Sequence, residues 1–339
     1  MAEKGQVRAR GASRAMRAAD TVSIALRGFA WAIVAATFVF ILNNYLTNWL
    51  NWPGPMSVLG EGTALAWVQL LFYVAGVAAA LAFAYRTGDR PVRADSAIMY
   101  GIVNYIVRVS FWAVFLIGTA DAVVSFLRVE GMLPGLFGEP LATDLGRSAY
   151  RGVWVHFPML ALAIVIATLT RGLAFHWLAF LVVASQLLIV ITRFIFSYEQ
   201  AFMSDLIRFW YAALFLFASA YTLFEDGHVR VDVLYSGFDD RRRGLINAVG
   251  AVVLGFALCW VIMVLGMASK SAIINSPLLA FETTQTGFGM YVKYWMAGYL
   301  GIFAITMLIQ FTGSFLEGAA DYRGEPGKRV LQTESAGVS

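Results

Sequence analysis

Charged residues are scarce in this sequence, and cysteine is nearly absent. Only 14% of the 339 residues are Asp, Glu, Lys or Arg, whereas soluble domains have about 25%. Such a chain cannot cover a water-facing surface, which excludes an ordinary soluble protein. The single cysteine, Cys259, lies in an apolar run and cannot form an intramolecular disulfide. With only three histidines in the chain, a Cys/His zinc site is not expected either.

Catalytic and nucleotide-binding motifs are missing as well. There is no Walker A motif, so direct use of ATP is not expected. Ser, Cys and His do not combine in a set that could activate a nucleophile, so we predict no catalytic, metal or cofactor site. Breaks that mark a transport site within a helix are poor, because Gly101 and Pro158 are isolated. The net charge of +4 does not indicate nucleic-acid binding, since the arginines lie beside apolar runs.

Hydrophobic residues, in contrast, make up 60% of the chain and gather in long runs. A helix needs about 20 apolar residues to cross a hydrocarbon core of about 30 Å. We therefore predict an all-α, polytopic integral membrane bundle of about eight transmembrane helices. The predicted spans are residues 28–50, 63–85, 99–124, 153–170, 173–195, 207–224, 245–268 and 293–316.

The distribution of Lys and Arg predicts the topology. If the N-terminus is cytoplasmic, the inner segments hold 17 of these residues and the outer segments hold seven. Basic residues favour the cytoplasmic side, so we predict that both termini are inside. The two longest outer loops are then 128–152, which contains two prolines, and its counterpart 269–292.

Four regions are predicted along the chain. Residues 1–27 form a basic cytoplasmic N-terminus, in which 13–27 is either a short interfacial helix or the start of the first span. Residues 28–170 form a four-helix membrane unit, 171–317 form a second one, and 318–339 form a disordered cytoplasmic tail. The fourth and fifth predicted spans are separated only by Arg171 and Gly172. A single helix over both would be about twice the membrane thickness, so we expect a hairpin there.

Two charged residues lie inside the third predicted span. Arg108 and Asp121 are 13 residues apart, about 20 Å along a helix, so they cannot pair with each other. A charge within the membrane is a functional candidate by default. Both lie near the ends of the span, however, which favours an interfacial role. His156 and His176 also lie near span ends and are interpreted as packed or interfacial.

A dense polar segment, residues 225–243, separates the sixth and seventh spans. Its aspartates can cap helix starts. Its arginines, including the triplet Arg241, Arg242 and Arg243, can meet anionic lipid headgroups. His228 could relay protons because it titrates near neutrality. The neighbouring residues favour a segment that lies along the inner membrane surface and docks there.

From about residue 173 onward the sequence resembles the small (Q, or DctQ-type) permease subunit of tripartite ATP-independent periplasmic (TRAP) transporters. Arg193 stands in an Arg-aromatic-x-Phe signature, and Asp205 stands where the family usually has Glu. A Gly-His-hydrophobic-x-hydrophobic-Asp motif follows; its members here are Gly227, His228, Arg230 and Asp232. Glu282 and Lys293 resemble the segment before the last span, although the proline expected after Lys293 is missing. The first 170 residues lie outside a four-span subunit of this kind.

The resemblance implies a role and partners. The chain would be a scaffold in the bacterial inner membrane for a large M permease subunit, which holds the substrate and ion sites. Uptake of organic anions such as carboxylates would need a periplasmic binding protein, and the outer loops are candidates for contacting it. The motif residues are candidates for the subunit interface, and membrane lipids are further partners. No cofactor is implied for this chain, since ion coupling belongs to the partner.

Two other functions remain open. A self-sufficient secondary transporter would have Asp121 and Arg108 facing a common cavity. The second alternative is a membrane-bound enzyme or a cofactor or redox protein. If the cofactor were haem, for instance, two of His156, His176 and His228 would have to lie at matching depth, and their predicted positions near opposite span ends disfavour this.

A weak internal similarity bears on the N-terminal half. Val92 to Asp95 follows the second span with a Val-Arg-x-Asp pattern, and Val229 to Asp232 repeats this pattern after the sixth span. The offset of 137 residues is close to that between the first and fifth predicted spans. We hypothesise that residues 28–170 are a degenerate duplicate of the second four-helix unit, with the two copies in parallel.

Overall fold

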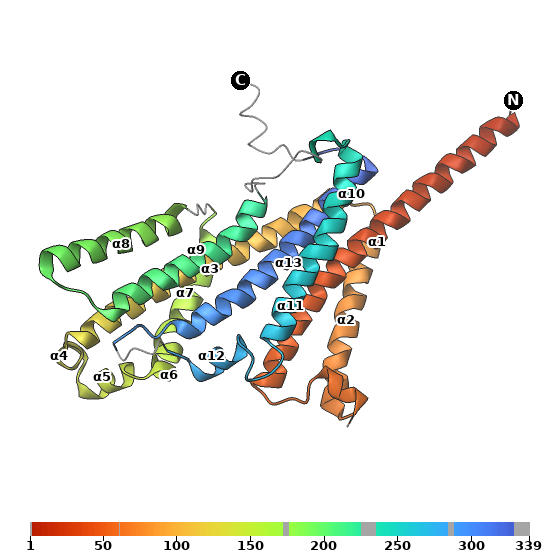
Figure 1. Ribbon diagram of the computed structural model, residues 1–339. Helices are drawn as coiled ribbons and strands as arrows, with labels where there is room; N and C mark the ends of the chain where they lie inside the picture. The colour runs from red at the N-terminus through yellow and green to blue at the C-terminus, as the bar shows by residue number, and fades with distance from the viewer. Residues whose placement is uncertain (1, 61, 172–175, 225–234, 284–287, 329–339) are drawn as a thin grey trace, which may run out of the picture. The chain divides into compact units, whose positions relative to one another are not determined.

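A computed structural model describes residues 2–60, 62–171, 176–224, 235–283 and 288–328 (Figure 1). These residues form helices and connecting turns, and no strand occurs among them. Eight helical stretches in this part of the chain are long and apolar enough to cross a membrane. The prediction of an all-α membrane protein with about eight spans is confirmed.

The eight candidate spans and their component helices follow the chain. Helices confine the backbone hydrogen bonds to the segment itself, as a bilayer requires. The spans are Thr21–Asn48 within α1 (Ala2–Asn48), α2 (Ala64–Arg86), α3 (Val92–Val129), Ser148–Leu169 (α6 Ser148–Arg151, the π-helix η2 Gly152–His156, α7 Phe157–Leu169), α8 (His176–Phe196), α9 (Ala201–Phe224), Asp240–Gly266 (α10 Asp240–Gly250, the π-helix η4 Ala251–Phe256, α11 Ala257–Gly266) and α13 (Lys293–Arg323).

Short helices occupy the connections between spans. The longest predicted loop, 128–152, contains α4 (Leu133–Phe137) and α5 (Glu139–Leu145), each with a proline in its first two positions. Proline is favoured there because the first helical N–H groups have no partner within the helix. The other short elements are η1 (Pro55–Leu59), η3 (Tyr235–Gly237) and α12 (Asn275–Ala280).

Several helix ends differ from the predicted boundaries. α1 is continuous from Ala2, so residues 13–27 are its early turns rather than a separate helix. α13 continues to Arg323, past the position where the polar tail was expected to begin. α7 ends at Leu169 and α8 begins at His176, so these are two helices and not one long one.

The chain divides into two compact units, each assembled from separate stretches of sequence. Unit 1 consists of residues 1–101, 225–259 and 308–339, and unit 2 consists of residues 102–224 and 260–307. The division falls within α3, within the 240–266 span and within α13, so it does not follow the predicted division at residue 170.

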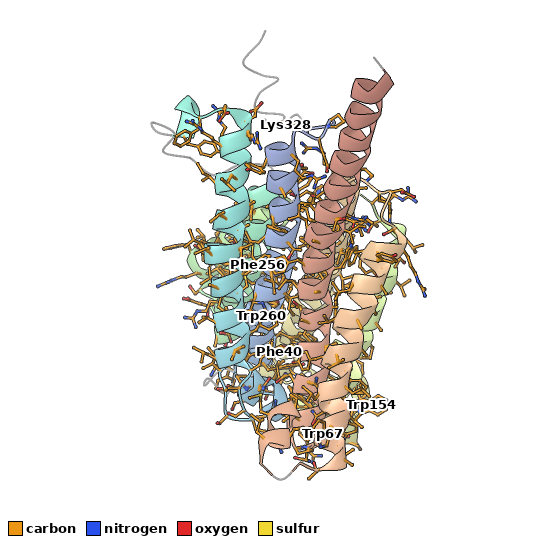
Figure 2. The ribbon with its side chains drawn as sticks, turned by 90° about the vertical axis from the view of Figure 1, so that its right-hand side faces the viewer. Phe40, Trp67, Trp154, Phe256, Trp260 and Lys328 are labelled. Carbon is orange, nitrogen blue, oxygen red and sulfur yellow. The ribbon has the colours of Figure 1, made fainter. Side chains whose placement is uncertain are left out.

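Unit 1 is built on close contact between helices. α1 packs along α2 (Figure 1), and Gln69 of α2 bridges Thr47 and the amide of Gly54. A core of small and aliphatic side chains joins Ala30 of α1 to the start of α3 and to α13. In Figure 2, Trp67 and Lys328 lie near opposite ends of this unit, with Phe256 between them.

Glycines permit the closest approach in unit 1. A Cβ on Gly244 of α10 would lie 2.6 Å from the carbonyl oxygen of Gly318 on α13, and a Cβ on Gly318 would lie equally close to the carbonyl of Gly244. The two backbones are therefore in direct contact. Small residues have this role in membrane helix pairs, where packing replaces the hydrophobic effect as the force between helices.

Unit 1 also holds a buried ion pair. The guanidinium of Arg27 is fully buried and donates from Nε to Asp95 at 2.6 Å and from both terminal nitrogens to Thr87. The indole of Trp31 donates to the same carboxylate at 2.9 Å. Nearby in sequence, Arg93 donates to Glu317, and to Asp321 at 2.6 Å. Each side chain has a partner that offsets the cost of removing its charge from water.

Unit 2 contains most of α3 together with α7, α8, α9 and the first half of α13. Gly118 of α3 lets α9 approach, because a Cβ there would lie 2.6 Å from the indole nitrogen of Trp210. That nitrogen donates to the carbonyl of Val114 at 3.3 Å. α8 lies beside α9 (Figure 1), and its other faces carry exposed apolar side chains suited to lipid.

Candidate functional site

A buried polar cluster lies in unit 2, near the C-terminal end of α3. We call it the Asp121 cluster; its members are Asp121, Ser125, Arg151, His156, Tyr291 and Tyr294. The side chains of Asp121, Ser125, Arg151 and His156 are completely buried, and Tyr294 is 1% exposed. A buried group of ionisable residues in a membrane protein is the strongest functional candidate in the described part of the chain.

The carboxylate of Asp121 is the centre of this cluster. Its Oδ1 accepts from the guanidinium of Arg151 at 2.9 Å and contacts Nε2 of His156 at 3.2 Å. Its Oδ2 accepts from the backbone N–H of Tyr291 at 2.7 Å. The cationic partner and these donors compensate for the loss of hydration, so a charged carboxylate can be buried here.

Arg151 connects the loop to the helices. Its Nε donates to the carbonyl of Leu145 at 2.5 Å, and one terminal nitrogen donates to Ser125 as well as to Asp121. Its guanidinium lies 4.2 Å from the centre of the Tyr291 ring, within cation–π range. The planar, permanently charged group thus holds three segments together.

The π-helical turn η2 explains how Arg151 and His156 reach the same carboxylate. In a regular α-helix, residues five apart point about 140° apart. Residues Gly152–His156 directly follow Arg151 and form a π-helix, whose i to i+5 hydrogen bonds widen the turn. Gly152 also leaves room for the ring of Phe281, which would overlap a Cβ at that position.

The proton on His156 can be placed from its neighbours. The indole nitrogen of Trp295, which can only donate, lies 3.3 Å from Nδ1. The hydroxyl of Tyr294 lies 2.6 Å from the same atom. Nδ1 must therefore accept, which leaves Nε2 to carry the proton that faces Asp121. The imidazole is thus oriented by hydrogen bonds on both sides.

An aromatic layer covers the cluster. Phe281 has a left-handed backbone conformation, with φ of 47°, which is rare and unfavourable for a bulky residue. Its ring packs edge-on against Tyr294, at a centroid distance of 5.3 Å, and against Phe157 at 6.2 Å. These contacts hold the strained turn after α12 in place.

Further polar contacts surround the cluster. Arg128 at the end of α3 donates to the hydroxyl of Tyr291, and to the carbonyl of Gly289 at 2.9 Å. The Tyr198 hydroxyl donates to Glu130 at 2.6 Å. Burial and this hydrogen bond raise the pKa of Tyr198 to about 12, so the hydroxyl remains a donor to Glu130 even in alkaline solution.

Asp205, a predicted motif residue, is buried in unit 2. Its carboxylate accepts from the backbone N–H of Met290 at 3.1 Å, one residue before the amide that Asp121 binds. Two carboxylates from α3 and α9 therefore hold consecutive amides of the segment that leads into α13. Asp205 was identified from the resemblance, whereas its role is visible only in the structure.

Substitution of Asp205 tests this contact. We expect Asp205→Leu to destabilise the protein by about 1–3 kcal/mol, since the buried Met290 amide loses this acceptor. Asp205→Asn retains a carbonyl oxygen of the same reach and should cost less. Unfolding midpoints in detergent measure both. Equal midpoints for the leucine variant and the wild type would contradict the assigned role.

The other predicted site residues are less enclosed. Arg193 is 60% exposed and lies 3.3 Å from Glu199. Glu282 and Lys293 form an ion pair with both side chains 41% exposed, and the Glu282 carbonyl accepts from the amide of Tyr294 at 3.1 Å. The motif residues Gly227, His228, Arg230 and Asp232 lie outside the described residues, as does the side chain of His176.

The arginine triplet lies in the first turn of α10. Arg241 lies 4.6 Å from the ring centre of Tyr322, and Arg243 lies 5.5 Å from that of Tyr235. The amide of Arg242 donates to the N-cap residue Asp239 at 3.2 Å. The capping carboxylate and the aromatic contacts direct three cations to one end of unit 1.

The Asp121 cluster was not predicted from the sequence. The sequence supports only an interfacial interpretation for Asp121 and a packed or interfacial one for His156, and Arg151 is counted there only as one of the seven basic residues of the outer segments. Asp121 and Tyr291 are 170 residues apart, so no local pattern could join them. The one usable signal was the position of a carboxylate within an apolar span. Arg108, its proposed counterpart across a cavity, instead donates to the carbonyl of Arg171.

The arrangement is suited to fastening the helices together. Each carboxylate oxygen of Asp121 has a donor, and no described cluster of His, Cys, Asp and Glu is suited to hold a metal ion. What the cluster does is connect α3, α6 and η2 to the segment before α13.

Comparison with known proteins identifies one part of the chain. Residues 182–321 match the family described as tripartite ATP-independent periplasmic transporters, DctQ component. The match covers less than half of the chain and includes α9 to α13 and most of α8. No curated protein and no solved structure matches the sequence.

Proposed function

We propose that this chain is an enlarged small membrane subunit of a TRAP transporter, because residues 182–321 match the DctQ family. In this role it serves as a scaffold for the large permease subunit. The large subunit would hold the substrate and ion sites and move substrate across the membrane. A periplasmic binding protein would deliver an organic anion, with carboxylates as the favoured class. The membrane is then the bacterial inner membrane, with both termini of this chain in the cytoplasm.

The match to the DctQ family is the single observation that carries this proposal. The contacts within each unit add a physical reason for a scaffold role. In unit 2 the DctQ domain provides Tyr291 and Tyr294, and the preceding helices provide Asp121, Arg151 and His156. In unit 1 Arg93 of α3 binds Glu317 and Asp321 of α13. Buried ion pairs and hydrogen bonds of this kind resist separation of the helices, as a fixed support for a moving subunit requires.

The extra N-terminal helices are thus an integral part of the scaffold rather than an appended module. We also propose that residues 28–170 are a degenerate duplicate of the second four-helix unit. Arg93 and Asp95 of the Val-Arg-x-Asp pattern both form ion pairs in unit 1. The triplet Arg241 to Arg243 is proposed to meet anionic headgroups, at about 1 kcal/mol for each charge.

Co-purification and reconstitution test the function. The tagged chain, purified from its own membranes, is expected to bring with it a large multi-span permease that mass spectrometry can identify. In liposomes, uptake of a dicarboxylate is expected only when this chain, the permease and the binding protein are all present with an ion gradient. Each component is omitted in turn as a control.

Two outcomes would overturn the proposal. Ion-driven uptake by this chain alone would identify a self-sufficient transporter, and full uptake by the permease without this chain would exclude a scaffold role. Asp121 and Arg108 give no support to the first possibility, since neither lines the apolar cavity between α3, α7, α9 and α13.

A further inference from the structure

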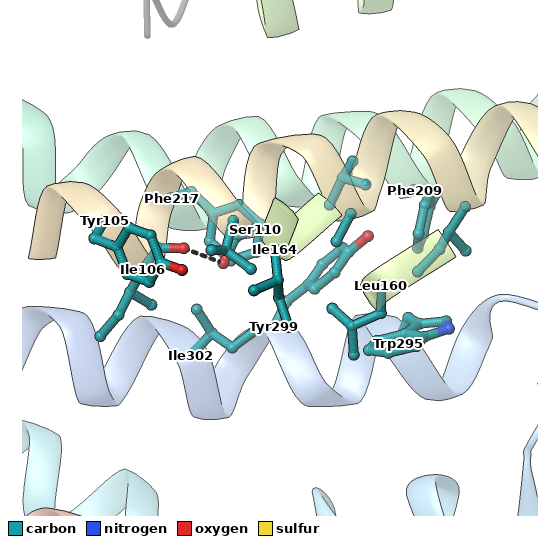
Figure 3. Close-up of a pocket in the computed structure, with 14 residues that line it drawn as sticks. Tyr105, Ile106, Ser110, Leu160, Ile164, Phe209, Phe217, Trp295, Tyr299 and Ile302 are labelled. Carbon is teal, nitrogen blue, oxygen red and sulfur yellow. Dashed lines mark hydrogen bonds between the residues drawn. The ribbon is translucent and has the colours of Figure 1, made fainter. Parts of the chain in front are cut away.

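An apolar, partly open cavity of about 310 Å³ lies in unit 2, between α3, α7, α9 and α13 (Figure 3). Its lining comes from the middle of α3, between Tyr105 and Ile117, and from the facing turns of the other three helices. Most of the lining side chains are aliphatic or aromatic. The volume is about twice that of an engineered apolar cavity known to bind benzene.

Few polar atoms face this space. The hydroxyl of Ser110 donates to the carbonyl of Ile106 at 2.9 Å, the bond drawn in Figure 3. The indole N–H of Trp295 is directed to His156 in the neighbouring cluster. Both groups therefore have partners within the protein, and neither needs a ligand.

Tyr299 differs from Ser110 and Trp295 because its polar group has no partner within the protein. Its side chain lines the cavity and is 2% exposed, and its hydroxyl has no hydrogen-bond partner. Its ring is fixed between Phe209 and Phe217, at centroid distances of 5.2 and 5.1 Å. A buried hydroxyl without a partner costs free energy. At the same position, phenylalanine would fill the same space without that cost.

We propose that this cavity binds a membrane-soluble molecule with an apolar body and a carbonyl oxygen that accepts a hydrogen bond from Tyr299. The almost wholly apolar walls disfavour water as the occupant, because a buried water needs two to four polar partners. Among the described lining residues, Tyr299 is the one with a buried hydroxyl that has no partner. A carbonyl needs only one donor, and the remaining apolar surface suits a hydrocarbon body. The carbonyl belongs either to a quinone ring or to the acyl ester of a membrane lipid.

Extraction of the purified full-length protein tests the proposal. Mass spectrometry of the organic extract is expected to find such a molecule bound in the wild type. Tyr299→Phe removes only the hydroxyl and should lower its retention about fivefold, the effect of one neutral hydrogen bond. Ala113→Phe fills the cavity from α3 and should abolish retention. Tyr211→Phe, on the exposed face of α9 (55% exposed), is the matched control and should retain the wild-type amount.

The stability of Tyr299→Phe gives a second readout that does not depend on Ala113→Phe folding. With a bound carbonyl, loss of the hydroxyl lowers the unfolding midpoint. With an empty cavity, the same change removes an unsatisfied group and raises the midpoint. Reloading stripped protein with decylbenzoquinone or with phosphatidylethanolamine distinguishes the two sources. A raised midpoint, or equal retention in all variants, would overturn the proposal.

Discussion

Replacing Arg151 with leucine is expected to lower the free energy of unfolding by about 3–5 kcal/mol. The change leaves Asp121 buried without its cation, and a buried uncompensated charge carries a cost of this size. The remaining donors, His156 and the Tyr291 amide, do not supply a permanent charge. Denaturant titration in detergent, followed by tryptophan fluorescence, measures the loss.

Arg147→Leu is the matched control, four residues earlier in the same segment. Arg147 also forms an ion pair with an aspartate, Asp144 at 3.1 Å, but its side chain is 69% exposed. Exposed pairs contribute about 0–1 kcal/mol, so this variant should remain close to the wild type. The double variant Asp121→Leu with Arg151→Leu should recover part of the loss, since no unpaired charge remains. Equal effects of Arg151→Leu and Arg147→Leu would show that the buried cluster does not hold the helices.

Gly244→Leu is expected to disrupt unit 1, with a loss of about 3 kcal/mol or more. The first side-chain atom would fall within 2.7 Å of the backbone of α13 at Gly318 and Tyr322. Overpacking by one or two methylene groups commonly costs about 1–3 kcal/mol. Here the obstructing atoms belong to a backbone and cannot rotate away, so α10 and α13 must separate.

Gly250→Leu provides the comparison on the same helix. A Cβ at Gly250 meets nothing within 4 Å, and leucine is a better helix former than glycine by about 1 kcal/mol. This variant should therefore be as stable as the wild type or slightly more so. Gly318→Leu should repeat the effect of Gly244→Leu. If the two α10 variants behave alike, α10 and α13 are not in backbone contact.

The eight spans could be predicted because hydrocarbon imposes a length and a composition on any helix that crosses it. The ends of α3 and α13 could not be predicted in this way, because charged residues in the sequence are interpreted as marking the limits of the membrane. Arg93 and Asp95 instead belong to the first turns of α3, and Glu317 and Asp321 belong to the last turns of α13. These charges remain within the helices because they pair with each other or with Arg27, and pairing across the fold leaves no mark in local composition.

The candidate site could also be predicted only in part from the sequence. Asp205 was predicted as a motif residue, since the resemblance compares one position at a time. The Asp121 cluster needs a π-helical turn to bring Arg151 and His156 together, and glycine at residue 152 to admit Phe281. Hydrophobic periodicity describes regular helices, so it contains no information on such a local widening. Long-range pairs and helix irregularities both require the folded chain.

The order of residues in the Asp121 cluster also has a consequence during synthesis. Arg151 follows Asp121 by 30 residues, which corresponds to about 2–6 s of translation at about 5–20 residues per second. Tyr291 follows it by 170 residues, or about 9–34 s. Asp121 is therefore made before Arg151, its cationic partner. The cluster can form completely only after Tyr291, in the segment before α13, has left the ribosome. The buried network is thus completed only late in synthesis, long after Asp121 itself has been made.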